Sequence, residues 1–135
     1  MIIEIRKDRI LPKEQLILLY DENSWSSAKK PEELYNGLIN SHSLLTAWDN
    51  DKLVGLGNAI SDGFLVVYYP HLIVLPDYQG KGVGRLIMDE MRKIYEDIHM
   101  QMLVADKDSL EFYKKVGFSK AGETTPMWIY SGNDH

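Results

Sequence analysis

The residues best suited to chemistry lie in one short stretch, Gln79 to Arg85, which reads QGKGVGR. It follows an apolar run that ends at Pro76 and leads into a segment with helical spacing of apolar residues. A strand that passes directly into a helix leaves the first helical amides unpaired, with the positive end of the helix dipole behind them. Glycines at positions 80, 82 and 84 let an anion approach the backbone, and Lys81 and Arg85 add positive charge. The stretch indicates a phosphate site, although a tight turn with two solvated cations gives the same pattern.

Two familiar phosphate loops fit this stretch poorly. A P-loop needs four residues between its first glycine and a Gly-Lys-Ser/Thr triplet, and the stretch has no such arrangement. The dinucleotide fingerprint Gly-x-Gly-x-x-Gly needs one residue more than Gly80 to Gly84 provide. A mononucleotide-binding domain is therefore a weak alternative.

Length and composition restrict the class of protein. A chain of 135 residues fits one domain, residues 1–135, with a core of its own. The net charge of −5 is opposite to that of a general nucleic-acid binder, and no apolar run is long enough to span a bilayer. The first ten residues lack the pattern of a secretory signal, so we expect a cytoplasmic location. The absence of cysteine excludes a cysteine nucleophile and a thiolate metal site, and the histidines lack metal-ligand spacing, so we expect no metal.

The spacing of apolar residues and the positions of proline and turn residues predict the elements that position the glycine stretch. Prolines 12 and 31 each open a predicted helix, and the turn Asp49–Asp51 joins two strands of a hairpin. Residues 64–75 are predicted as one strand, buried on both faces, at the centre of the sheet. Pro70 cannot donate to a ladder, so the sheet is expected to open there.

The remaining elements complete a mixed α/β fold. The predicted elements are a first strand over 1–7, a helix over 83–98, a short strand over 100–105, a helix over 108–116 that stops at Gly117, and one or two strands in 118–131. The order is β-α-α-β-β-β-α-β-α-β, with parallel pairing around the glycine stretch.

Two motifs resemble those of a known family. Gln79 to Gly84 is similar to the Q/R-x-x-G-x-G/A loop of the GNAT N-acetyltransferase superfamily, and it follows an apolar strand ending in Val-x-Pro, as is usual there. The segment DSLEFYKKVGF, from Asp108 to Phe118, is similar to the helix motif of that family ending in F-Y-x-K-x-G-F. The resemblance in element order covers nearly the whole chain and implies a GNAT-like fold with a splayed central sheet.

The resemblance also implies acetyl-coenzyme A as the acetyl donor. Its pyrophosphate would lie on the amides from Gly80 to Gly84, and its pantetheine arm would enter the splay and bond the strand at residues 72–74 as an added strand would. The Val74 N–H would face the thioester oxygen. The residues that it implies for cofactor binding are Leu72, Ile73, Val74, Gln79, Gly80, Lys81, Gly82, Val83, Gly84, Arg85, Asp106, Ser109, Phe112 and Lys115.

Acetyl transfer to an amine needs an acid for the leaving thiolate and a base for the amine. Tyr113 is the candidate acid, because a phenol of pKa about 10 stays protonated at neutral pH, and its place in the helix motif matches the family's. His71, Tyr68 and Tyr69 are candidate bases acting through water, with His71 ranked first. A lone histidine on a strand is also common as a structural residue.

The acceptor is expected to be a primary amine on a small molecule or a peptide. Trp25 offers an amphipathic platform and Glu22 could hold a cation, while Tyr68 and Tyr69 are further candidates for acceptor binding. The predicted activity is direct attack of the amine on acetyl-coenzyme A through a tetrahedral intermediate. The alternative is a non-catalytic sensor of acyl-coenzyme A with the same fold, and family analogy leaves a homodimer open.

Overall fold

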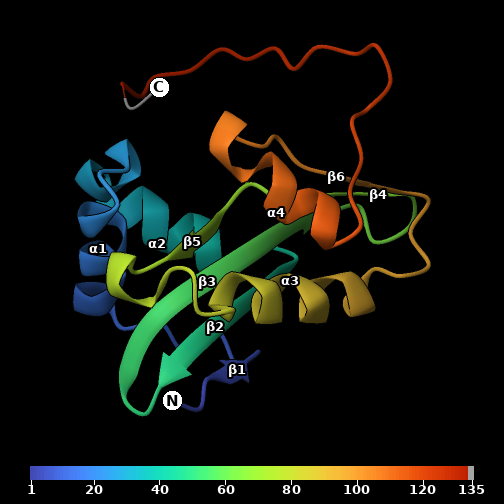
Figure 1. Cartoon of the computed structure of the whole chain (residues 1–135). Coiled ribbons are helices and arrows are strands. Elements are labelled where there is room, and N and C mark those ends of the chain that lie inside the picture. The colour runs from blue at the N-terminus through green and yellow to red at the C-terminus, as the bar shows by residue number, and fades with distance from the viewer. Residues whose placement is uncertain (134–135) are drawn as a thin grey trace.

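Strand β3 (Lys52–Ser61) holds the sheet together in the computed structural model, which describes residues 1–133. It pairs antiparallel with β2 (Ser43–Asp49), β4 (Val66–Tyr68) and β5 (Leu72–Val74). The described strands run in the order β1-β2-β3-β4-β6, with β5 attached to β3 off this path (Figure 1). The outer strands are β1 (Glu4–Arg6), antiparallel to β2, and β6 (Met100–Met102), parallel to β4. The mixed α/β class predicted from the sequence is confirmed.

The helices lie around this sheet in the arrangement shown by Figure 1. Helix α3 crosses in front of β3, and α4 lies above α3. Helices α1 and α2 lie at the left of the view. The α-helices are α1 (Lys13–Glu22), α2 (Pro31–Ile39), α3 (Val83–Ile94) and α4 (Leu110–Lys115), and the 3₁₀ turns are η1 (Ser26–Lys29), η2 (Pro76–Tyr78) and η3 (Lys107–Ser109).

Two glycines of β3 let α3 lie close against the sheet. A Cβ atom built on Gly57 would be 2.8 Å from Cγ2 of Ile87, and one built on Gly55 would be 3.4 Å from Cδ1 of Ile87 and 3.0 Å from the carbonyl oxygen of Ile73 in β5. Ile87 is fully buried, and so is Met91 one turn further along the helix. Glycine is therefore required at these positions for space, and the glycine stretch at the start of α3 is fixed against the sheet.

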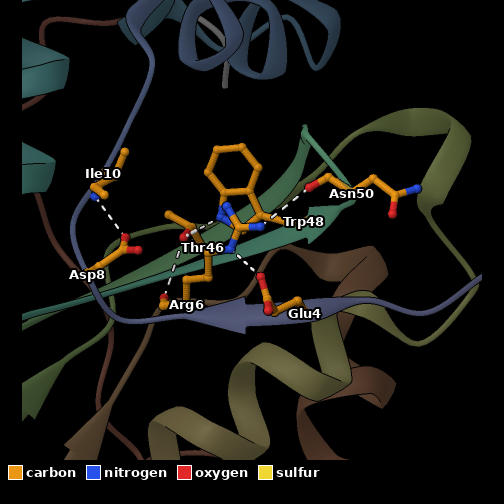
Figure 2. Close-up of polar contacts among 7 residues, drawn as sticks. All are labelled: Glu4, Arg6, Asp8, Ile10, Thr46, Trp48 and Asn50. Atoms are coloured by element: carbon orange, nitrogen blue, oxygen red, sulfur yellow. Dashed lines mark hydrogen bonds and ion pairs between the residues drawn. The ribbon is translucent and has the colours of Figure 1, made fainter.

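The β1–β2 edge is stabilised around a buried tryptophan. The indole nitrogen of Trp48 donates to Thr46 Oγ1 at 2.8 Å, so its buried polar atom is satisfied. The guanidinium of Arg6 lies 4.5 Å from the Trp48 ring centre and also pairs with Glu4, as Figure 2 shows. This edge lies on the other side of β3 from β4 and β6.

The single strand predicted over residues 64–75 is wrong. Pro70 divides this run into β4 and β5. Strand β4 pairs with β6 and with the end of β3 at Ile60 and Ser61, whereas β5 pairs with β3 at Gly55–Gly57. The expected opening of the sheet at Pro70 is confirmed, and the central strand is β3. Every residue of β3 from 53 to 59 is buried.

The strands predicted in 118–131 are also wrong. Residues 118–133 contain no helix or strand, and the segment runs away from the sheet and across the top of the view in Figure 1. Other predictions are confirmed. The hairpin turns at Asn50 with a positive φ of 53°, both proline-led helices form, and α4 ends before Gly117 at φ 105°.

We expect Gly57→Ala to destabilise the protein by about 1–3 kcal/mol, because its methyl group would overlap Ile87 in a packed interface. Gly37→Ala is the matched control. Gly37 lies inside α2, and a Cβ atom there would have no neighbouring atom within 4 Å, so alanine is expected to stabilise by roughly 0.5–1 kcal/mol. Urea unfolding of the two variants measures both changes. Equal stability of the two variants would contradict the close packing of α3 on β3.

Candidate functional site

The glycine stretch forms a tight turn that leaves the N-terminus of α3 open. Gly80 and Gly82 have φ angles of 75° and 88°, in the region that favours glycine, and Gly82 caps α3. The first helical hydrogen bond runs from the Leu86 N–H to the Gly82 carbonyl at 3.1 Å, so the amides of residues 83–85 precede the helical ladder. Within residues 1–133, no side chain caps this end. The turn therefore presents amide donors and the positive end of the helix dipole, which together suit an anion.

The surroundings of the three glycines differ. A Cβ atom on Gly80 or Gly82 would have no atom within 4 Å, so the turn is open on that side. A Cβ atom on Gly84 would lie 3.4 Å from Cζ of Phe112 and 3.8 Å from Cδ2 of Leu72. The first turn of α3, strand β5 and helix α4 therefore meet at this point. The two sequence motifs, far apart in the chain, are neighbours in the fold.

The two cations of the turn are placed differently. The Lys81 amine is exposed and lies 5.7 Å from the centre of the Tyr78 ring. Arg85 is half-exposed and its Nε atom is 3.1 Å from Oδ1 of Asp89, one turn along α3. An exposed pair of this kind is weak, so Arg85 can exchange Asp89 for a stronger anion at modest cost.

Gln79 is exposed, and its side chain fixes the turn to its neighbours. Its side-chain nitrogen donates to the Val74 carbonyl at 2.9 Å and to Oδ1 of Asn23 at 3.0 Å. Asn23 follows α1 and in turn donates to the Val74 carbonyl at 3.1 Å and to the Leu19 carbonyl at 2.9 Å. The sequence analysis assigned Gln79 to cofactor binding and missed Asn23. In the structure, Gln79 and Asn23 join the turn, the end of α1 and the end of β5.

Strand β5 has one open edge. The bonds from the Asn58 N–H to the His71 carbonyl (3.2 Å) and from the Leu75 N–H to the Val54 carbonyl (2.8 Å) flank the three paired residues of β5. In an antiparallel ladder this register directs the Ile73 amide toward β3 and the Leu72 and Val74 amides away from it. On the other side, the parallel pairing of β4 with β6 ends where the Tyr69 N–H donates to the Met102 carbonyl at 3.0 Å. The Val74 N–H thus faces the opening between the two halves of the sheet.

Helix α4 lies beside this opening and brings Tyr113 with it. Tyr113 is half-buried, and its ring contacts the rings of Phe112 and Phe118 at centroid distances of 5.1 and 6.1 Å. Burial raises the pKa of the Tyr113 hydroxyl to about 12, and the carboxylate of Asp106 adds to the rise. The phenol therefore stays protonated at neutral pH and can donate a proton.

The other predicted residues of this region have different surroundings. Asp106 precedes η3, and its carbonyl accepts bonds from the Ser109 N–H and hydroxyl, both at 2.9 Å. The Ser109 hydroxyl is therefore used within its own turn. Lys115 is the exposed last residue of α4. None of these contacts tests the predicted roles in cofactor binding.

An aromatic cluster holds His71 between β4 and β5. Nδ1 of His71 is 2.7 Å from the hydroxyl of Tyr20, a fully buried residue of α1. The Trp25 ring meets the His71 ring edge-on at a centroid distance of 5.2 Å. The His71 N–H donates to Oδ1 of the buried Asn58 at 3.0 Å, which satisfies the backbone beside Pro70. His71 and Trp25, predicted from separate segments, are thus brought together.

Tyr20 is the hydrogen-bond partner of Nδ1 in the His71 ring. Burial raises the pKa of its phenol well above the ordinary value, so the hydroxyl remains neutral. A neutral hydroxyl can accept a bond from Nδ1–H, and in that tautomer Nε2 of His71 carries the lone pair of a base. The sequence analysis took Tyr20 only as an apolar position of a helix. No local sequence signal marks its contact with a residue 51 positions away.

The remaining predicted acceptor residues do not all lie with this cluster. Tyr69 is buried, its hydroxyl donates to Oε1 of Gln101 at 2.7 Å, and burial raises its pKa. Its ring contacts those of Tyr95 and Phe118 rather than that of His71. Tyr68 is exposed on β4, and Glu22 is exposed at the end of α1.

Two hollows in the described part of the chain lie away from this opening. One, of about 310 Å³, is at the C-terminal end of α3 near His42, Tyr95 and Ile98. The other, of about 260 Å³, lies beside Gln101. Neither contains a residue of the glycine turn, so we place the candidate site at the open edge of β5. Among residues 1–133, no group of three metal-ligating side chains lies together, and no helix has the length and apolarity needed to cross a membrane.

Comparison with known proteins identifies the family. An acetyltransferase (GNAT) domain model matches residues 10–127. A GNAT-family acetyltransferase of Streptococcus pneumoniae is 31% identical with a TM-score of 0.81, and the alignment covers 96% of this chain and 99% of that one. The chain therefore belongs to the GNAT acetyltransferase family, and the resemblance found in the two motifs is confirmed.

Two more distant relatives extend the comparison. GCN5-related N-acetyltransferase 3 of Arabidopsis thaliana, a chloroplastic protein, is 28% identical over 127 residues, which are 85% of this chain and 54% of that protein. The chain spans about half or less of the length of the first curated relatives that it matches. An aminoglycoside N-acetyltransferase, solved in complex with coenzyme A, is 14% identical and shares the fold with a TM-score of 0.71. The alignment covers 96% of this chain and 93% of that protein's chain.

The raised pKa of Tyr113 predicts a loss of stability at high pH. In the unfolded chain a tyrosine ionises near pKa 10, whereas folded Tyr113 holds its proton to about 12. Its contribution to the free energy of unfolding is therefore complete below pH 10 and is lost as the pH rises to about 12. Urea midpoints at about pH 9 and about pH 11 should fall less in Tyr113→Phe than in the wild type. An equal fall in both proteins would contradict the burial of this hydroxyl.

Proposed function

We propose that the protein is an N-acetyltransferase that moves the acetyl group of acetyl-coenzyme A to a primary amine by direct attack. The observation that carries this proposal is the open edge of β5, which lies between an amide-lined glycine turn and a helix that carries a protonated phenol. An anion site, a strand edge and an acid on adjacent elements match the needs of a long phosphate-bearing thioester. The coenzyme A complex of the aminoglycoside N-acetyltransferase with the same fold supports this donor.

The chain offers matching groups for each part of the donor. The amides of residues 82–85 and the side chain of Lys81 would bind the pyrophosphate, and Arg85 could join them by leaving Asp89. Leu72 and Val74 have their amides toward the opening, where a pantetheine arm would bond them as an added strand does. Phe112, which contacts the start of α3, would line the arm on its other side.

Val74 would stabilise the charge that develops on the thioester oxygen. Its carbonyl is held by the amides of Gln79 and Asn23, so the orientation of the strand at this residue is fixed before substrate binds. An aligned backbone donor in such a position is typically worth about 3 kcal/mol in the transition state. Gln79 then contributes by positioning Val74, in addition to its place in the turn.

Tyr113 would return a proton to the departing thiolate. A phenol whose pKa is about 12 is fully protonated at neutral pH, so it would donate a hydrogen bond to the sulfur and stabilise the charge that develops there as the carbon–sulfur bond breaks. Its ring is fixed between Phe112 and Phe118. The base on the opposite side would be His71, whose ring is oriented by Tyr20 and Trp25 and whose Nε2 would take the amine proton through water.

Trp25 and Glu22 would receive the acceptor. Trp25 lies against His71, so an amine that stacks on the indole would approach the proposed base. Glu22 is exposed nearby in the chain and would attract a cationic acceptor. Tyr68 and Tyr69 remain predictions for acceptor binding. The buried hydroxyl of Tyr69, already bonded to Gln101, makes it the weaker of the two.

We expect Gly82→Asp to weaken coenzyme A binding by at least tenfold. Aspartate would adopt a φ of 88° only with strain and would place a negative charge at an anion site. Gly122→Asp is the matched control, because Gly122 also has a positive φ and open space but lies in the C-terminal segment. Calorimetry measures both affinities. Unchanged binding by the Gly82 variant would remove the glycine turn from the site.

We expect Tyr113→Phe to lower kcat at least tenfold with little change in the KM for acetyl-coenzyme A, and Tyr35→Phe, on α2, to leave both unchanged.

His71→Asn should remove the acidic limb of the pH dependence of kcat/KM, whereas His99→Asn, at an exposed position, should retain it. Thiol release with a panel of primary amines measures these rates. Tight binding of acetyl-coenzyme A without thiol release for any amine would favour the sensor over the enzyme.

A further inference from the structure

Tyr78, the last residue of η2, connects the segment before the glycine turn to the β2–β3 hairpin. Its hydroxyl donates to Oδ2 of Asp49, at the end of β2, at 2.6 Å. Its N–H donates to the Leu75 carbonyl at 2.8 Å, which closes η2. The bond to the Asp49 carboxylate raises the pKa of the phenol, which therefore keeps its proton at neutral pH and acts as the donor. Two segments 29 positions apart are thus joined just before Gly80.

The hairpin to which Tyr78 is bonded is itself held by α1. The side chain of Gln15 in that helix donates to the Asp51 carbonyl at 3.1 Å and accepts from the Leu53 N–H at 2.7 Å, so it spans the hairpin turn. The side chain that follows Tyr78 in the sequence bonds Asn23, at the C-terminal end of the same helix. The chain that enters the glycine turn is therefore fixed at two successive residues.

The ring of Tyr78 faces two cations. The amine of Lys81, in the glycine turn, lies 5.7 Å from the ring centre, and that of Lys52, at the start of β3, lies 5.4 Å from it. Both distances are within the range of a cation–π interaction. Tyr78 therefore acts on the turn in two ways, because its hydroxyl fixes the chain before the turn and its ring attracts the lysine within it.

The glycine turn needs an anchor of this kind. Gly80 and Gly82 have positive φ angles and open space on the side where a Cβ atom would lie, so side-chain packing does not restrict them there. A ligand that must order a mobile turn loses part of its binding free energy, whereas a turn fixed beforehand avoids that cost. Tyr78 and Asp49 are both half-buried, so water could satisfy either group, and the fold does not require their bond.

We propose that Tyr78 is a positioning residue for the donor, and that its bond to Asp49 fixes the glycine turn in the form that presents the amides of residues 82–85. The inference rests on the proposed function, because it takes the turn as the site of the coenzyme A diphosphate. Loss of the Tyr78 hydroxyl should weaken the binding of the diphosphate. It should leave unaffected the pantetheine arm, which bonds β5.

The test compares coenzyme A with pantetheine, which lacks the diphosphate. Tyr78→Phe removes the hydroxyl and keeps the ring that faces the lysines. We expect the dissociation constant for coenzyme A, measured by NMR titration of the backbone amides, to rise at least threefold, and that for pantetheine to stay the same. Tyr35→Phe is the matched control and should change neither constant, because the Tyr35 ring also faces a lysine, Lys13 at 4.7 Å, but lies on α2.

Asp49→Ala provides a second variant that acts on the same bond. It should weaken the binding of coenzyme A less in Tyr78→Phe than in the wild type, because the bond is already absent there. Equal effects of Asp49→Ala in both backgrounds, equal weakening of coenzyme A and pantetheine, or an unchanged affinity of Tyr78→Phe for coenzyme A would each overturn this proposal alone. A wild-type protein that binds coenzyme A no more tightly than pantetheine would overturn the proposed diphosphate site as well.

Discussion

The candidate site depends on one backbone constraint, the loss of a hydrogen-bond donor at Pro70 in the middle of an apolar run. A continuous strand over this run could pair along both edges and would leave no backbone group for a ligand. The proline and the side chain of Asn58, which takes the His71 amide, allow the run to split. The first half pairs with β6 and with the end of β3, and the second half pairs with the middle of β3. The opening between them is where the Leu72 and Val74 amides point.

The groups around this opening are held by contacts that serve the fold as well. Gln79 and Asn23 bond the same carbonyl of Val74, so the glycine turn, α1 and β5 are fixed relative to one another. Gly84 allows Phe112 of α4 to approach the start of α3. Tyr20, a core residue, orients His71. Packing and function therefore share residues, and the charged groups of the turn remain at the surface where a ligand can reach them.

Local chemistry made much of this predictable from the sequence. Glycines 80, 82 and 117 adopt the positive φ angles that only glycine takes readily, and Pro12 and Pro31 begin helices because proline is suited to that position. The two motifs indicated the family whose domain model matches residues 10–127. The sequence also marked Pro70 as a break, although it did not show that the first half would pair with β6 and the second with the middle of β3.

Long-range contacts account for what the sequence did not predict. The bonds of Tyr20 to His71 and of Asn23 to Val74 each join residues 51 positions apart, and periodicity carries no information at that distance. The C-terminal residues have the composition of a strand, yet composition does not say which edge a strand will pair with. Gln79 matched a family motif, but its hydrogen bond to Asn23 joins residues 56 positions apart, and Asn23 has no motif of its own.

The central claim is that the open edge of β5 and the adjacent glycine turn receive coenzyme A, and a crystal structure with that molecule bound tests it most directly. We expect diphosphate oxygens within hydrogen-bond distance of the amides of residues 82–85, with the pantetheine arm bonded to Leu72 or Val74 and its sulfur between Tyr113 and His71. Coenzyme A bound in either of the hollows near Tyr95 and Gln101, with its diphosphate away from Gly82, would contradict it.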